Sequence, residues 1–451
     1  MSWFNELFTH HPEQQTVSAP PGKARRSIPP GGAVKSSKPA VADAQKLPQA
    51  ILQNFVPLRN LDAAVISSLT YNVDTYPAEA VIFNLGEKSP SIPYLLDGEV
   101  EMQPDSDSHY SISAGSEEAH LPLNSGKRFG ATAVARTETK ILNVSADLTS
   151  LWTVQQQEIT CVELMDIELP EAISDSQFFN SFAQAYRENK LQLPSLPNVA
   201  LKLKEAVAHD IGAAEAAEII QLDAPIVSNL IQVANSPLYA PVAPITNCID
   251  AVTRLGLNAA RNLVLGISLK QLFKCQDRQL MKSMLSLWKN SVYVSSLSFV
   301  LADESGCVNP EDALLAGLVC DIGIVPLLHF TEQYPDKHPD LQQLRTAIPY
   351  LRGPVGSLVL HTLGFTEELT RIPHYAEDWF HDSGDKLTII DIVILAKLHS
   401  YIGTGKTTSL PHINTIPAYS KLKDGKLTPD FSLNVLRLAN KRISAAMNIL
   451  G

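Results

Sequence analysis

Long hydrophobic runs are missing from this sequence. No stretch approaches the roughly 18 consecutive apolar residues that a membrane-spanning helix needs. The first fifteen residues, MSWFNELFTHHPEQQ, lack the basic segment and apolar segment that begin a secretory signal. We therefore expect a cytoplasmic protein with no membrane span.

Cysteines and charges are also few. The five cysteines are an odd number and none are spaced as CxxC, a pattern that suits reduced thiols and argues against a disulfide framework or a cysteine zinc cage. Charged residues make up 18% of the chain, too few for a charged coiled coil or a wholly disordered protein. A net charge of −11 argues against a protein that coats nucleic acid, so we expect no nucleic-acid partner.

What is present is a chain of 451 residues, 45% of them hydrophobic, which suits two to four domains with sizeable cores. Residues 1–48 are rich in Pro, Gly, Ser and Lys and carry six basic against three acidic residues, a charge of +3. The remainder therefore carries −14, since −11 minus +3 is −14. Such a composition predicts a disordered tail.

The rest of the chain changes its periodicity twice. Residues 49–150 have a short helical pattern followed by short β-type segments such as PYLLDGEVEM, separated by glycines, which predicts a β-roll with flanking helices. Residues 151–192 form a helical connector, and 193–405 follow helical spacing throughout, as short helices bounded by prolines. Residues 406–451 are a loop and a helix that we expect to pack on this all-α domain. The predicted class is multidomain α+β.

The helical part resembles an HDOD domain. The resemblance rests on LPSLPNVALKLKEAV, on LDAPIVSNLIQVANSP and on the helix that contains AVTRLGLNAARNLVL, and it covers roughly residues 190–405. HDOD domains are helical relatives of the HD and HD-GYP phosphodiesterases and occur in bacterial signalling proteins. The resemblance implies a bacterial regulatory protein.

The segment 51–150 is similar to a cyclic-nucleotide-binding domain, on FVPL at 55–58, AVIF at 80–83 and YLLDGEV at 94–100. The resemblance implies a ligand loop with a glutamate and an arginine nine residues later, and it points to Gly98, Glu118, Arg128 and Thr132. Here Glu118 and Arg128 are ten residues apart. One extra residue displaces a phosphate cradle by about 3 Å, more than hydrogen bonds tolerate. We expect a β-roll without its ligand; an altered anion pocket is the open alternative.

The HD resemblance implies a metal site of His and Asp ligands, which this sequence has largely lost. The matching positions hold Asn290, the pair Cys320-Asp321 and Pro354, and only Asp321 and His374 remain as ligand types. Lys397 stands where a metal enzyme tends to have an acid. A catalytic site needs at least three protein ligands, so we predict no metal, no cofactor and no catalytic residues. Asp321 is expected to bond a neighbouring helix, for example at Asn290; a zinc site of Cys320, Asp321 and His374 is the alternative.

These patterns predict a non-enzymatic regulatory protein, a pseudoenzyme that acts through protein–protein contacts of its HDOD domain within a signalling pathway. One alternative is a sensor in which a cyclic nucleotide binds the β-roll and shifts the HDOD domain. The other is a residual metal-dependent phosphohydrolase. The sequence does not specify the input signal, the protein partners or the oligomeric state.

Overall fold

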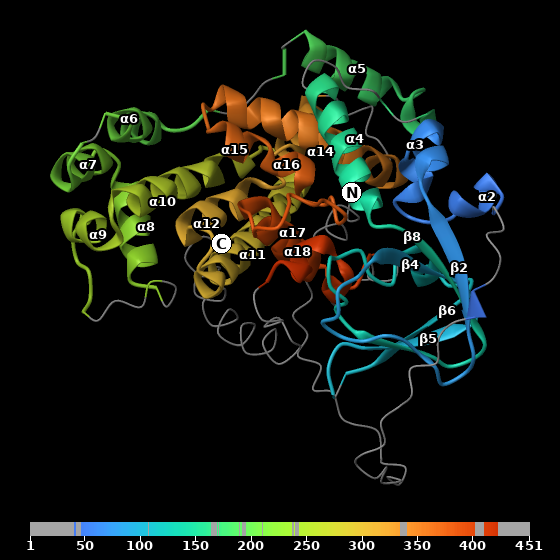
Figure 1. The fold of residues 1–451 in the computed structure, drawn as a ribbon. Coiled ribbons are helices and arrows are strands. Elements are labelled where there is room, and N and C mark those ends of the chain that lie inside the picture. The colour runs from blue at the N-terminus through green and yellow to red at the C-terminus, as the bar shows by residue number, and fades with distance from the viewer. Residues whose placement is uncertain are drawn as a thin grey trace, which may run out of the picture.

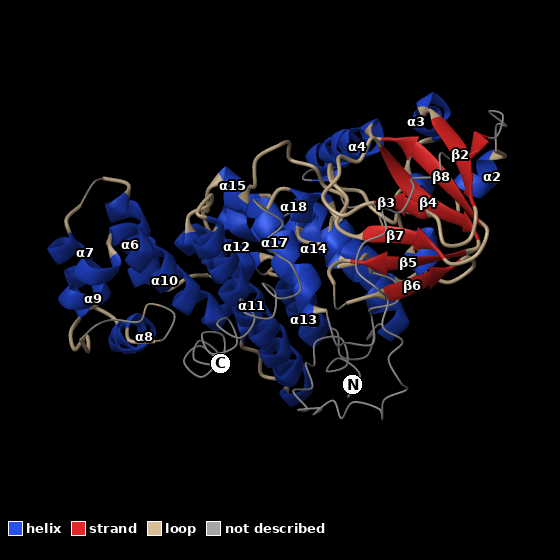
Figure 2. Ribbon diagram, turned by 60° about the horizontal axis from the view of Figure 1, so that its bottom comes forward, coloured by secondary structure: helices blue, strands red, loops and turns tan. Residues whose placement is uncertain are grey.

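The computed structural model describes residues 40–41, 47–106, 108–163, 169, 171–188, 190–191, 195–209, 211–236, 239, 243–333, 341–401 and 410–422. Most of the predicted tail and the predicted final helix, residues 431–450, lie outside these residues. The strands gather at one end of the molecule and the helices at the other (Figures 1 and 2). This arrangement confirms a β-rich N-terminal part followed by an all-α domain.

The β-roll consists of two four-stranded sheets, with strand orders β1-β2-β8-β4 and β3-β7-β5-β6. All neighbouring strands are antiparallel. The strands are β1 (Ala40–Val41), β2 (Tyr71–Tyr76), β3 (Val81–Phe83), β4 (Ser91–Asp97), β5 (Glu99–Gln103), β6 (Tyr110–Ser113), β7 (Thr132–Ala135) and β8 (Thr139–Ser145). The flanking helices are α2 (Gln49–Leu52), η1 (Leu58–Asn60), α3 (Ala63–Ser68) and η2 (Glu118–His120).

Strand β8 shows how the β-roll builds two cores. Ile141 belongs to the core between the sheets, whereas Leu142 and Val144 belong to a second core under the flanking helices. Successive side chains of a strand point to opposite faces, so one strand serves both cores. All three are at most 1% exposed.

The helical part contains one long helix, α11, and many shorter ones. Its elements are α4 (Asp147–Glu163), η3 (Glu171–Ile173), α5 (Gln177–Arg187), α6 (Asn198–Val207), α7 (Ala213–Ile220), α8 (Ala224–Ala234), α9 (Cys248–Leu255), α10 (Leu257–Leu269), η4 (Lys270–Phe273), α11 (Arg278–Ser305), α12 (Pro310–Val319), α13 (Ile324–Gln333), α14 (Leu341–Thr362), α15 (Glu367–Thr370), α16 (Ile372–Tyr375), α17 (Ile389–Ser400), η7 (Ile413–Thr415) and α18 (Pro417–Ser420).

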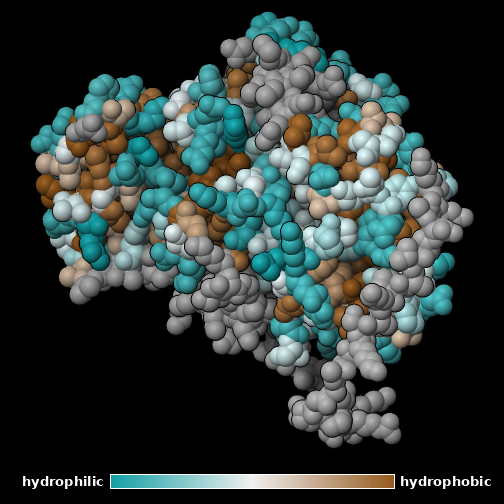
Figure 3. Space-filling view, viewed as in Figure 1, coloured by the Kyte–Doolittle hydropathy of each residue, from teal (hydrophilic) through white to brown (hydrophobic). Residues whose placement is uncertain are grey.

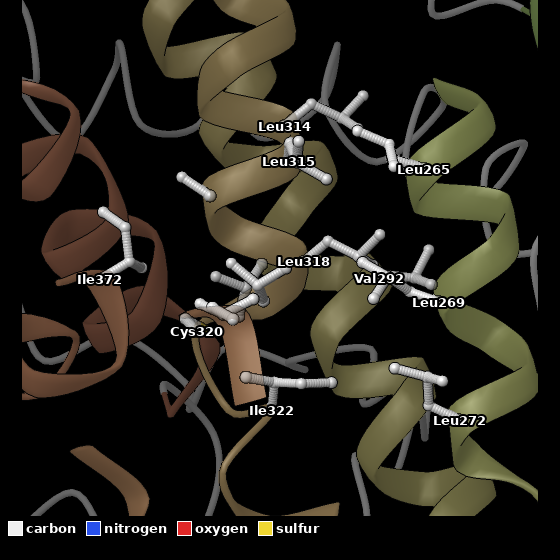
Figure 4. Packing of buried hydrophobic residues seen from close by; sticks show 14 of the residues in the cluster. Leu265, Leu269, Leu272, Val292, Leu314, Leu315, Leu318, Cys320, Ile322 and Ile372 are labelled. Carbon is white, nitrogen blue, oxygen red and sulfur yellow. The ribbon is translucent and has the colours of Figure 1, made fainter. Parts of the chain in front are cut away.

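Helix α11 corrects the expectation of uniformly short helices. It runs for 28 residues because no proline or glycine interrupts Arg278–Ser305. Helix α14 runs for 22 residues although Pro349 and Pro354 lie inside it, so prolines do not mark every boundary. Helix α12 packs between α10 and α11, where Leu314 and Leu318 lie beside Leu265, Leu269 and Val292 (Figure 4).

One described segment, Pro310–Glu332, is long and apolar enough for a membrane span by length and composition alone. It was not foreseen because the sequence test required an uninterrupted apolar run, which Asp321 breaks. In the structure 94% of its most apolar window is buried inside the protein. Core helices of soluble proteins have this property.

The two parts of the chain meet through the loop between α16 and α17. Phe380 of this loop is 4% exposed and belongs to the second core of the β-roll. Beside it, the indole N–H of Trp152 in α4 donates to Asp378 (2.7 Å), and the Asp382 N–H donates to Thr153 (3.1 Å). Helix α4 thus packs on the β-roll side, whereas Phe179 in α5 lies in the core of the helical domain.

A lobe of α6 to α9 projects from the far end of the helical domain, and hydrophobic residues gather over it (Figure 3). Leu222, in the turn between α7 and α8, is 67% exposed, and Ile249 in α9 is 43% exposed. Two large apolar side chains therefore face solvent on this lobe.

Candidate functional site

The position that corresponds to a metal site holds a buried ion pair. Asp321 lies in the turn after α12 and is 0% exposed, and Lys397 of α17 is 2% exposed. The Lys397 ammonium donates to Asp321 Oδ2. Asn290 Nδ2 of α11 also lies 3.4 Å from Oδ2, the contact that the sequence suggested. Asp321 therefore takes its partners from α17 and α11.

A second ion pair lies against the first. Arg352 Nη1 of α14 donates to Glu377 Oε1 at 2.5 Å, and it lies 3.9 Å from Asp321 Oδ1. Lys397 Nζ lies 3.7 Å from Glu377, whose carboxylate also accepts from the Tyr401 hydroxyl. We call Asp321, Arg352, Glu377 and Lys397 the charge cluster. Its two acids and two bases sum to zero.

The cluster keeps Lys397 and Glu377 charged. Burial, the largest single effect, lowers the pKa of Lys397, but the charge of Asp321 and those of other neighbours, Glu377 among them, together raise that pKa well above its usual value. Burial raises the pKa of Glu377, but Arg352 and Lys397 outweigh it and lower that pKa. Each charge removed from water is thus compensated by an opposite charge, as buried charges require.

Cys320 is sealed in the apolar core at the end of α12 (Figure 4) and is 0% exposed. Burial, and then the neighbouring charge of Asp321, raise the pKa of its thiol. Only a thiolate is an effective metal ligand or nucleophile. Cys320 is therefore a core residue with its proton in place.

The two remaining positions of the predicted remnant site lie on α14 and α16. Pro354 is inside α14, and its carbonyl faces the Tyr186 hydroxyl at 3.5 Å. His374 packs on Gly353, where a Cβ would lie 2.6 Å from Nδ1. Burial, aided by the charge of Arg352, lowers the pKa of His374 to about 4, so the ring is neutral at pH 7.

A divalent metal does not fit these residues. Lys397 and Arg352 direct two positive charges at Asp321, the carboxylate that a metal would need. Among the described residues, no three His, Cys, Asp or Glu side chains are placed to hold a metal ion. The zinc alternative of Cys320, Asp321 and His374 gains no support from this geometry.

Arg352, Glu377 and Tyr401 were not predicted from the sequence, although they complete the cluster. A signal was present for one of them: Arg352 is a single charge between apolar residues in YLRGPVGSLVL. A charge that helical spacing turns toward a core needs a partner. The sequence could not indicate that the partner lies in the loop after α16.

The predicted ligand residues of the β-roll serve its own structure. Gly98, in the turn from β4 to β5, has φ +92°, and a Cβ there would lie 2.5 Å from the Glu138 carbonyl oxygen. The exposed Arg128 donates from Nη1 to the Gly86 carbonyl (2.8 Å), and Thr132 Oγ1 accepts from the Leu85 N–H (3.1 Å). Arg128 and Thr132 thus both hold the loop after β3.

Glu118 begins the short helix η2, five residues after β6 ends at Ser113. It is half-buried, and its charge contributes to raising the pKa of Tyr110, after the larger effect of burial on that phenol. Glu118 therefore faces the β6 side of the roll.

The loop between η2 and β7 is covered by residues 410–422, which we call the strap. The Thr415 carbonyl accepts from both the Ser125 N–H (2.7 Å) and the Ser125 hydroxyl (2.9 Å). Asn414 Nδ2 donates to the Gly130 carbonyl (3.0 Å), and the Lys127 N–H donates to Ser420 Oγ (3.2 Å). In Figure 1 the strap helix α18 lies beside α17 and next to the strands.

Comparison with known proteins gives a family for the helical part. The family model of the HDOD domain matches residues 193–377. A crystal structure titled "Putative metal-dependent phosphohydrolase" from Shewanella amazonensis SB2B is 25% identical, with a TM-score of 0.52, and covers 60% of this chain and 98% of that one.

Two further similarities are more distant. An uncharacterized protein of Treponema pallidum is 22% identical over 173 residues, and the chain spans about a third (33%) of the length of this curated relative. A structure titled "Putative Cyclic nucleotide-binding protein" from Geobacter metallireducens GS-15 is 14% identical, covers 32% of this chain and 92% of that one, and has a TM-score of 0.19.

Proposed function

Because residues 193–377 are an HDOD domain, we propose that the protein is a non-enzymatic regulator of a bacterial signalling pathway that acts in the cytoplasm through protein–protein contacts of this domain. The observation that carries the proposal is the ion pair between Lys397 and Asp321. An ammonium bonded to the remaining carboxylate takes the place that a metal-activated water would need.

The exposed lobe of α6 to α9 supports a role in contacts. Leu222 and Ile249 expose apolar surface at the end of the domain farthest from the β-roll. Apolar side chains that gather at one exposed place favour association with another protein.

The non-enzymatic part of the proposal is tested with the full-length protein and Mn²⁺. We expect no turnover of bis-p-nitrophenyl phosphate or cyclic di-GMP, and no heat of Mn²⁺ binding in calorimetry. Asp321→Ala serves as the matched control, because contaminating hydrolase activity is independent of this residue. Turnover by the wild type that Asp321→Ala abolishes would overturn the proposal.

The contact part is tested by capture from a native extract. The double variant Leu222→Asp, Ile249→Asp should lose partners that the wild type retains, because a charge on an exposed apolar patch opposes desolvation. Val154→Asp is the control, since Val154 is 51% exposed but lies on α4, beside the β-roll. Equal capture by all three proteins would count against contacts through this lobe.

A further inference from the structure

The strap contacts the two domains with different chemistry. On the helical side, Ile416 is 0% and Ala418 is 1% exposed, and both belong to the large helical core. The Lys421 side chain, 2% exposed, donates to Asp391 Oδ1 (2.8 Å) and lies 3.2 Å from Asp382 Oδ1. The helical domain thus holds the strap by apolar burial and a buried ion pair.

On the β-roll side the strap is held by polar contacts and one ring stack. They are the hydrogen bonds of Asn414, Thr415 and Ser420 described above, together with His412, whose ring stacks on Tyr110 with centroids 3.8 Å apart. When a hydrogen bond to a peptide group breaks, water can take the place of the lost partner, so the net cost is small. Separating a buried apolar side chain or a buried ion pair from its surroundings costs more. The contact with the β-roll is therefore the weaker of the two.

The loop of the β-roll is shaped around the strap. A Cβ on Gly130 would lie 1.7 Å from the Asn414 carbonyl oxygen, and one on Gly126 would lie 2.7 Å from Ser420 Cβ. The N–H groups of Ser125 and Lys127, two donors of this loop, are taken by strap oxygens. No other molecule has access to these donors while the strap is in place.

We propose that the strap, residues 410–422, is a latch that belongs to the helical domain and occupies loop 124–130 of the β-roll as an intramolecular ligand. When the latch opens, it breaks at the loop and the strap stays with the helical domain. The strap and any external ligand of this loop exclude each other. This inference does not depend on whether the charge cluster is catalytic.

Hydrogen exchange of the full-length protein tests the latch. In Gly130→Ala the new methyl collides with the strap, so the Ser125 and Lys127 amides should exchange at least tenfold faster than in the wild type. The Lys421 amide, bonded to the Ala418 carbonyl within the strap, should keep its protection. Gly212→Ala is the matched control, because a Cβ at Gly212 meets nothing within 4 Å.

A milder variant guards against a β-roll that fails to fold. Asn414→Ala with Ser420→Ala removes two strap contacts without adding bulk, and it should accelerate exchange at Lys127 while the β8 amide of Leu142, paired with β2 and β4, stays protected. Unchanged exchange at Ser125 and Lys127 in both variants would overturn the latch. Loss of protection at Lys421 together with the loop would show that the strap is not anchored to the helical domain, and would also overturn it.

Cyclic AMP and cyclic GMP serve as probes of exclusion. Calorimetry of the wild type at millimolar nucleotide should give no binding heat. Binding to the wild type with unchanged protection at Ser125 and Lys127 would disprove mutual exclusion. Phosphohydrolase activity of the same preparation would refute the proposed function but leave the latch intact, so the two failures can be told apart.

Discussion

Lys397 is bonded to Asp321 in the interior of the helical domain, with both side chains at most 2% exposed. A buried charge that loses its partner is costly, by about 3–5 kcal/mol. The pair is therefore a structural requirement of the domain, and its removal one residue at a time tests this directly.

We expect Lys397→Met to lower the free energy of unfolding of the helical domain by about 3–5 kcal/mol, because it leaves Asp321 charged and unpaired by an ammonium. Adding Asp321→Asn should recover part of the loss. Urea unfolding followed by circular dichroism measures both. The control is Arg371→Met, whose exposed pair with Glu367 should contribute less than about 1 kcal/mol. Equal effects of the buried and exposed changes would contradict this assignment.

Gly98→Ala should destabilise the β-roll by about 2–4 kcal/mol, because the new methyl meets the Glu138 carbonyl and the backbone has a positive φ. Gly115→Ala is the control: it shares a positive φ, +84°, but has open space around the Cβ, so about 1–2 kcal/mol is expected. Thermal unfolding of the two variants separates collision from backbone strain. A smaller loss for Gly98→Ala than for Gly115→Ala would refute the collision.

Asp378 gives stability a pH dependence at the domain junction. Burial raises the pKa of this carboxyl to about 6, against an ordinary value near 3.9. The folded protein thus takes up a proton below pH 6 that the unfolded chain does not, and this group makes the protein less stable as pH rises from about 4 to 6. Asp378→Asn, which keeps an acceptor for Trp152, should stabilise the protein by about 1–2 kcal/mol at pH 7.5.

At pH 4 the same Asp378→Asn change should give little gain, because the Asp378 carboxyl of the folded wild-type protein is then neutral and burying it no longer requires burying a charge. Thermal unfolding at the two pH values checks this. A gain that is equal at pH 4 and pH 7.5 would mean that ionisation of Asp378 is not the cause.

His412 acts in the opposite direction. Burial lowers the pKa of its ring to about 4, so the unfolded chain binds a proton below pH 6.5 that the folded protein refuses. The contribution of the His412 ring to the free energy of unfolding is fully present above about pH 6.5 and is lost as the pH falls toward 4. His412→Phe keeps a ring against Tyr110 but cannot take up a proton. At pH 4.5 the variant should therefore lose about 1–3 kcal/mol less of its free energy of unfolding than the wild type does. His374 and His381, whose pKa values are also lowered to about 4, remain in the variant, so the part of the acid destabilisation that they cause should persist.

Periodicity was sufficient to predict the order of the fold. Alternating apolar residues in PYLLDGEVEM and helical spacing after Leu193 are local patterns, and each was realised as strands or helices. These predictions succeeded because each depends only on neighbouring residues and on which face they bury.

Contacts between distant segments could not be predicted in this way. Arg352 meets Glu377 because α14 and the loop after α16 pack together, and Ser125 meets Thr415 across 290 residues of chain. No local pattern records such a pairing. The sequence therefore predicted that residues 406–451 pack on the helical domain, but it could not indicate the completed charge cluster or the contacts of the strap with the β-roll.

Phe380 has a consequence for the order of synthesis. It completes the second core of the β-roll, yet the ribosome adds it more than two hundred residues after strand β8, since the neighbouring Trp152–Asp378 bond already spans 226 residues. The β-roll emerges first with its second core lacking this aromatic side chain. Its final maturation therefore waits for translation to pass α16, and a fragment that stops at residue 150 reproduces the nascent chain, not the finished domain.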